Sequence, residues 1–150
     1  MHDPHFSKNL LTGNDEIDNQ HRELFQLIQD LRLDIQLGNQ ERARITFQNF
    51  LDYIVNHFTF EEMLMYKVKY PKEALEKHRL AHRTLQEIYL ISYKPIIDNE
   101  LPVHRILELF ESYFLNHLLE EDCLLAEFVN KQREENPDEM AQILASLKYE

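Results

Sequence analysis

The chain has 150 residues, of which 43% are hydrophobic, and that is enough to build the core of one globular domain. Its formal net charge of −11 argues against a nucleic-acid partner, because phosphate binding needs a basic surface. The one cysteine, Cys123, excludes an internal disulfide and fits a reducing compartment. Since the N-terminus has no apolar signal core and no run is long enough for a membrane span, we expect a single cytoplasmic domain over residues 1–150.

The scarcity of chain breakers, two glycines and five prolines, predicts long helices rather than many short strands. After an irregular arm, Asn14 or Asp15 can cap a first helix, and Gly38 ends it in a left-handed conformation. Residues 94–101, which contain Pro95, are predicted to connect the third helix to the fourth. The four predicted helices cover about 15–37, 40–67, 71–93 and 102–128, and a short amphipathic tail helix covers about 137–148.

Short connections between long amphipathic helices imply that neighbouring helices are antiparallel. We therefore predict an all-α fold, an antiparallel up-down-up-down four-helix bundle with an N-terminal arm, whose core covers about residues 14–131. The tail helix carries its apolar side chains on one side, and we expect it to pack across one end of the bundle rather than to serve a partner. The apolar stripe of the fourth helix is predicted to pass through Phe110, Tyr113, His117, Leu124 and Phe128.

Five of the eight histidines fall on the apolar stripes of the predicted helices. His57 and Glu61, like His78 and His82, stand four residues apart, so both members of each pair point the same way from a helix. A single histidine in an apolar stripe usually bonds to a neighbouring side chain. Five of them, spread over four helices, need more polar partners than the interior of a bundle offers, and a metal centre is the simplest partner. The five histidines are His21, His57, His78, His82 and His117.

Two carboxylates are predicted to share this interior, and they are Glu61 and Asp122. Asp122 follows His117 by five residues, roughly 500° of α-helix, so we expect it to lie well round from His117 and to reach between two metal ions. Five imidazoles divided between two ions leave one ion with an open coordination position for a small molecule. Because no thiolate takes part, iron, manganese, zinc and copper all fit the ligand set. The other acidic residues nearby are predicted to face solvent, namely Glu62, Glu120 and Glu121.

The chain resembles a known family at these positions. The spacing of the candidate ligands, His…His-x3-Glu…His-x3-His…His-x4-Asp, and the stretch from Glu16 to His21 are similar to the hemerythrins, in the single-domain form found in bacteria, over about residues 14–130. The resemblance implies two non-haem iron ions with an oxo or hydroxo bridge. A six-coordinate iron would be bound by His78, His82 and His117. A five-coordinate iron, where dioxygen binds, would be held by His21 and His57, and the two bridging carboxylates would be Glu61 and Asp122.

The resemblance also implies an oxygen pocket and a function. Phe58 and Leu119 match apolar walls of the family's oxygen pocket, and Tyr113 stands where an aromatic residue is expected. The chain departs from many hemerythrins because it has no tryptophan. The implied function is reversible dioxygen binding for carriage, storage or delivery, without enzymatic activity. An oxygen-consuming protein is the kind of partner that such a role would serve, and a monomer is favoured.

Other interpretations of the ligand set require motifs of their own. A carboxylate-rich di-iron oxygenase or ferroxidase uses Glu-x-x-His pairs, and a zincin hydrolase needs His-Glu-x-x-His. Neither motif occurs in the chain. A sensor of oxygen or redox state that acts through a separate partner protein stays open, and the tail helix is the feature to test for it. A di-iron peroxidase or a nitric-oxide-detoxifying protein is a less favoured alternative.

Overall fold

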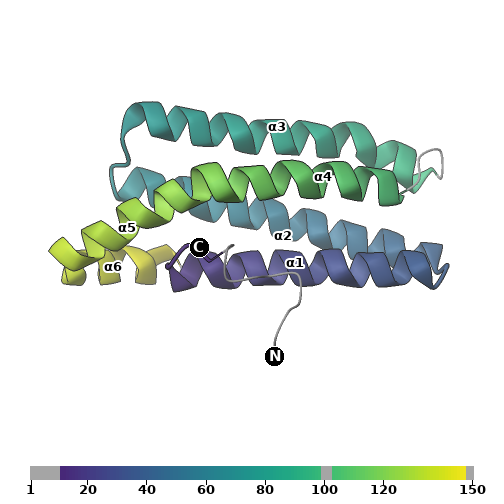
Figure 1. Ribbon diagram of the computed structural model, residues 1–150, viewed down its shortest axis with the longest axis horizontal. Helices are drawn as coiled ribbons and strands as arrows, with labels where there is room; N and C mark the ends of the chain where they lie inside the picture. Colours follow the sequence, from purple (N-terminus) through teal and green to yellow (C-terminus); the bar gives the residue numbers. More distant parts are fainter. Residues whose placement is uncertain (1–10, 99–102, 148–150) are drawn as a thin grey trace.

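The computed structural model of the protein describes residues 11–98 and 103–147, and the regular elements there are helices. Four rods lie side by side and run alternately in opposite directions (Figure 1). The first three rods are α1 (Asp15–Gln36), α2 (Gln40–Lys67) and α3 (Lys72–Ile97), and the fourth rod begins with α4 (Val103–His117). The predicted all-α, up-down-up-down bundle is therefore confirmed. The arm before residue 11 and the predicted start of the fourth helix at Pro102 lie outside the described residues.

The first two helices begin and end where the sequence predicts, because their caps are encoded locally. The side chain of Asn14 accepts a hydrogen bond from the backbone N–H of Ile17 at 3.1 Å, and Asn39 accepts one from Arg42 at the same distance. Each bond satisfies one of the N–H groups that the first turn of a helix leaves unpaired. Gly38, between the two helices, has a φ of +70°, a conformation that glycine adopts without steric cost.

The third helix is longer than predicted. α3 continues to Ile97 with Pro95 inside it, so the prediction that a connection begins at residue 94 is wrong. Proline removes one backbone hydrogen bond, to the carbonyl four residues earlier, which here belongs to the well-exposed Ile91. The missing hydrogen bond lies in the last turn of the helix, where the N–H of Asp98 still donates to the carbonyl of Lys94 at 2.9 Å. The rest of the predicted connection, residues 99–101, lies outside the described part of the chain.

The fourth rod changes its winding part-way along. After α4 it passes through a π-helical segment, η2 (Leu118–Asp122), and continues as α5 (Cys123–Glu135). A π-turn bonds residue i to residue i+5 and so holds about one residue more than an α-turn. The buried stripe after this segment is therefore shifted by one position: Leu125 and Val129 are fully buried, whereas Leu124 is 54% exposed. The predicted stripe through Leu124 is wrong for that reason.

The tail helix α6 (Pro137–Leu147) folds back against the ends of α2 and α5 (Figure 1). It buries Met140, Leu144 and Leu147, and the Lys67 ammonium of α2 donates a hydrogen bond to the Ser146 hydroxyl at 2.8 Å. The expectation that this helix packs across one end of the bundle is confirmed. None of the helices in the described ranges combines the length and the apolar character that crossing a bilayer requires.

Two apolar clusters fill the interior, one toward the α1–α2 turn and one around α6. Each rod contributes to both clusters, and in each rod the two contributions are separated by polar side chains. In α2, for example, Phe58 belongs to the first cluster and Leu64 to the second, with the buried Glu61 between them. In the fourth rod, Asp122 lies between Leu118 and Leu125 in the same way. A polar layer therefore crosses the bundle between two apolar ones.

Candidate metal centre

The polar layer consists of seven side chains that the four rods project into the interior, and each of these residues is at most 3% exposed. Their Cβ atoms face inward because they continue the apolar stripe of each helix at spacings of three and four. α1 and α2 supply His21, His57 and Glu61, α3 supplies His78 and His82, and the fourth rod supplies His117 and Asp122. These are the seven ligands that the sequence predicts, and the structure brings all of them together.

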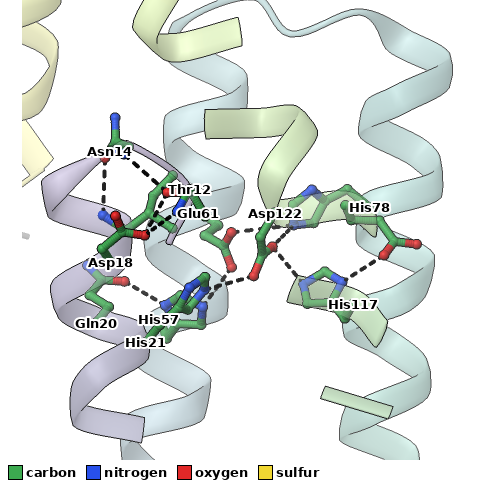
Figure 2. Close-up of polar contacts among 12 residues, drawn as sticks. Thr12, Asn14, Asp18, Gln20, His21, His57, Glu61, His78, His117 and Asp122 are labelled. Carbon is green, nitrogen blue, oxygen red and sulfur yellow. Dashed lines mark hydrogen bonds and ion pairs between the residues drawn. The ribbon is translucent and has the colours of Figure 1, made fainter. Parts of the chain in front are cut away.

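The seven side chains form two overlapping groups that could each hold a metal ion. In each group, one ligand atom per residue lies within 4.8 Å of the corresponding atom of every other member. Both groups contain Glu61 and Asp122, and Figure 2 shows these two carboxylates between the histidines of α1 and α2 on one side and His78 and His117 on the other. The histidines divide as three and two: His78, His82 and His117 against His21 and His57.

The imidazole Nε2 atoms converge on the carboxylate oxygens. His21 and His117 approach Asp122 at 2.8 and 2.9 Å, and His78 lies 3.0 Å from the same residue. His57 and His82 approach Glu61 Oε1 at 2.8 and 3.4 Å. Each carboxylate thus contacts imidazoles of both groups, as a bridging ligand must.

Most of these close approaches are not aligned as hydrogen bonds. Within the described residues, both oxygens of Glu61 and the Nε2 atoms of four histidines are buried without a hydrogen-bond partner. Leaving a buried polar atom unpaired costs about 1–3 kcal/mol, so a cluster of them calls for a partner. A cation between the lone pairs satisfies all of them at once, and the donors, imidazole and carboxylate, suit iron. The four histidines are His57, His78, His82 and His117.

The π-helical segment brings Asp122 into this site. In an uninterrupted α-helix, five residues turn roughly 500°, and Asp122 would point well away from His117. Across η2, five residues make a little more than one wider turn, so Asp122 returns to the side of His117 and its Oδ1 lies 2.9 Å from Nε2. The expected angle between the two side chains is therefore wrong, although Asp122 does reach between the two groups.

The electrostatics of the layer keep both carboxylates ionised. Burial raises the pKa of Glu61, but the neighbouring imidazoles outweigh it and hold that pKa well below the ordinary value. The pKa of Asp122 is also lowered, against burial and the charge of Glu61, by His117 and His21. Although burial lowers the pKa of His78 and of His117, the carboxylates raise them to about 9 and about 10. Protons and a metal ion therefore compete for these nitrogens, because only neutral imidazole binds metal.

Two side chains that lie beside Nδ1 atoms of the ligand histidines were not predicted from the sequence. His57 Nδ1 donates a hydrogen bond to the side-chain oxygen of Gln20 at 2.6 Å (Figure 2). The carboxylate of Glu121, predicted to face solvent, is instead 11% exposed and lies 3.4 Å from His117 Nδ1. The i,i+4 spacing of His117 and Glu121 could have indicated the second contact. The contact between Gln20 and His57 depends on how α1 and α2 pack, so the only sign of it in the sequence is that Gln20 directly precedes His21.

Aromatic rings pack against the ligands, although only one of the predicted pocket residues is among them. The Phe58 ring is fully buried, stacks on His82 with 4.0 Å between ring centroids and also lies beside His57. Phe114, which the sequence analysis did not single out, is fully buried with its ring edge-on to His21 at 5.8 Å.

Two of the predicted pocket residues, Leu119 and Tyr113, are 50% and 46% exposed, so the structure places them at the surface and not among the fully buried side chains. Two residues are close to half of a wider π-turn, so Leu119 points away from the side of His117. Viewed along the helix axis, Tyr113 and Phe114 project to opposite sides of His117. Phe114 faces α1, where its ring contacts His21 and Phe25. Tyr113 lines a groove on the surface between α3 and α4, which Leu80 and the edge of His117 also line.

A comparison with protein families matches residues 12–129 to the hemerythrin HHE cation-binding domain. The chain belongs to the hemerythrin family. It is similar to a bacteriohemerythrin of Pseudomonas aeruginosa, with 33% identity over 82 residues, 54% of this chain and 49% of the relative. It also resembles a bacteriohemerythrin of Campylobacter jejuni, with 26% identity over 127 residues, 80% of this chain and 90% of the relative. The match thus spans about half the length of the Pseudomonas protein.

The fold also matches a solved structure, the crystal structure of a leucine-to-phenylalanine mutant, with a TM-score of 0.71 and 25% sequence identity. The match covers 77% of this chain and 88% of the other. Membership of the hemerythrin family supports binding of non-haem iron, and the buried cluster of histidine, glutamate and aspartate suits a metal site. The tail helix α6 lies beyond the residues that the hemerythrin family model matches.

Proposed function

We propose that the protein binds dioxygen reversibly at a non-haem di-iron centre, as an oxygen carrier, store or delivery protein. The observation that supports this function is the unequal division of the ligands into a three-histidine and a two-histidine group that share Glu61 and Asp122. An ion held by the smaller group has fewer protein ligands and so keeps a coordination position for a small molecule. Two ferrous ions at these positions would supply the electrons for reversible dioxygen binding.

Each protein group has a separate role in this proposal. His78, His82 and His117 would hold one ion, and His21 and His57 would hold the other. The carboxylates of Glu61 and Asp122 would be shared by the two ions and would balance their charge, since both carboxylates stay ionised inside the bundle. Placing all seven ligands on rigid helices holds the site in one geometry before any metal arrives.

The rings around the site support reversible binding rather than oxidation. Phe58 and Phe114 are fully buried and pack against histidines of the two-histidine group. Apolar rings exclude water and offer no acidic proton to a bound oxygen molecule, so they give it no route to bond cleavage. We infer that these two rings, and not Leu119 or Tyr113, form the walls of the oxygen pocket.

Metal analysis combined with visible spectroscopy tests the proposal. Purified protein, loaded with ferrous iron without air, is expected to hold two irons per chain and to gain a visible absorption band when oxygen is admitted. The band should disappear when oxygen is removed and return on the next cycle. A single bound ion, or a band that never reverses, would rule out reversible carriage. Steady consumption of hydrogen peroxide or nitric oxide would instead indicate an enzyme.

We also infer that the chain acts as a monomer with one hemerythrin-like domain. The seven ligands all come from one chain, so the site needs no second copy to be complete. Light scattering coupled to size-exclusion chromatography should give a molar mass near 18.2 kDa for the monomer. A mass of twice that value at low protein concentration would contradict the inference.

A further inference from the structure

The hydrogen bond between His57 and Gln20 differs from the surroundings of the other four ligand histidines. Among the described residues, the Nδ1 atoms of those four are buried without a hydrogen-bond partner, although the Glu121 carboxylate lies 3.4 Å from one of them, His117 Nδ1. His57 Nδ1, in contrast, has the amide oxygen of Gln20 at 2.6 Å, in a part-buried position. The four other histidines are His21, His78, His82 and His117.

The bond determines which nitrogen of His57 carries the proton. An amide oxygen only accepts hydrogen bonds, so Nδ1 must be the donor, and the lone pair of a neutral ring is then on Nε2. That Nε2 atom faces the shared carboxylate Glu61 at 2.8 Å, on the side where the ligand atoms of the two-histidine group meet. The hydrogen bond therefore selects the metal-binding tautomer and limits rotation of the ring at the same time.

The choice of an amide rather than a carboxylate also has a physical reason. The layer already contains two buried anions, Glu61 and Asp122, and an amide at the part-buried Gln20 places no further charge beside them. Gln20 orients a ligand without adding charge. On the opposite side of the site, the group near His117 Nδ1 is the carboxylate of Glu121, at 3.4 Å, and this side chain is 11% exposed, so water can solvate its charge.

We propose that Gln20 is a positioning residue that holds His57 in the Nδ1-protonated tautomer and so sets the metal affinity of the two-histidine position. This inference rests on the proposed di-metal function. Because Gln20 directly precedes His21, one turn of α1 supplies both a ligand and the group that orients the other ligand of the same position. The register of α1 against α2 thereby controls the geometry of the ion that would bind oxygen.

Zinc titration of the metal-free full-length protein tests this role, since zinc needs no oxygen chemistry. The wild type is expected to bind two zinc ions. In Gln20→Leu, the affinity of one of them should fall about 10- to 100-fold, the usual effect of losing an outer partner of a metal ligand, while the other stays within about threefold. Gln20→Glu keeps an oxygen acceptor at a part-buried position, so both affinities should stay within about threefold of the wild type. Gln26→Leu is the matched control and should change neither affinity, because Gln26 is an exposed glutamine on the same helix whose side chain donates to Asp30, four residues further on.

Nitrogen NMR of the zinc-loaded protein supplies a readout that a purely structural role would not change. The Nδ1 proton of His57 should exchange slowly in the wild type and in Gln20→Glu, and its signal should be lost in Gln20→Leu. If the leucine variant does not fold, Gln20→Asn replaces it, because an amide shortened by one methylene cannot reach the ring. Retention of both zinc affinities and of the Nδ1 signal in the folded variants would overturn the proposal. Failure of the wild type to bind two zinc ions would instead refute the di-metal site itself.

Discussion

The ligand layer and the apolar clusters on either side of it are equally buried but differ in how their atoms are satisfied. In the cluster toward the α1–α2 turn, rings such as Phe50 and Phe110 pack edge-on at 5.1 Å and need no partner beyond each other. In the ligand layer, buried nitrogen and oxygen atoms face one another unpaired. The clusters therefore stabilise the fold by burying apolar surface, whereas the layer is a cost that a bound cation offsets. Stability and metal binding should accordingly be separable by mutation.

The largest effect is expected from removing a shared carboxylate. Asp122→Ala takes a ligand from both groups, so iron affinity should fall by more than about 100-fold, beyond the usual loss for an outer partner. Iron content per chain, measured after gel filtration, checks this. Asp34→Ala is the matched control, because Asp34 is also a buried carboxylate but accepts from Thr46 at 2.7 Å in the α1–α2 region. If Asp34→Ala loses iron equally, the effect belongs to folding and not to ligation.

A substitution in the apolar cluster should show the opposite pattern. Phe50→Ala removes a ring that is 1% exposed, and such truncations lower the free energy of unfolding by about 3–5 kcal/mol. Denaturant unfolding of the iron-loaded protein measures this loss. The molecules that remain folded should keep the iron content of the wild type, because Phe50 belongs to the cluster and not to the ligand layer. Depletion of iron in the folded fraction would argue against the separation of the two regions.

A smaller loss is expected at the tail helix. Leu144→Ala in α6 opens space in the peripheral cluster, where the residue is 6% exposed, and should cost about 2 kcal/mol, the low end for buried leucines. Iron content and the oxygen-dependent band should not change. Thermal unfolding followed by circular dichroism gives the stability, and a lost band in a folded Leu144→Ala protein would show that α6 acts on the site.

The smallest effect is expected at Leu119. Because this side chain is half exposed, Leu119→Ala should change stability by less than about 0.5 kcal/mol and leave the lifetime of the oxygen-bound form unaltered. Phe114→Ala should shorten that lifetime, since removing a buried ring beside His21 lets water approach. The rate at which the oxygen-dependent band decays compares the two variants. A faster decay in Leu119→Ala but not in Phe114→Ala would support Leu119 as a wall of the oxygen pocket, as the family resemblance implies.

The amino-acid sequence was sufficient to predict the bundle and the composition of its polar layer. Caps at Asn14 and Asn39 and the helical spacing of apolar side chains are local properties, so they indicate helices and their inner faces without knowledge of packing. Metal-capable side chains on those inner faces identify the candidate ligands, because the interior offers them few other partners. His57 with Glu61 and His78 with His82 are close in sequence, and a regular helix is enough to pair them.

Only the tertiary structure decided how those side chains face one another. The π-turn that brings Asp122 to the side of His117 forms where the fourth rod changes its hydrogen-bond spacing. The periodicity of apolar residues, which is read over many residues, does not reveal such a one-residue shift. The contact of Gln20 with His57 and the burial of Phe114 in place of Tyr113 depend on which helix lies opposite and at what rotation. Periodicity defines a face of a helix about 100° wide, whereas ligation and pocket walls need each side chain placed within that face, and only packing between helices does so.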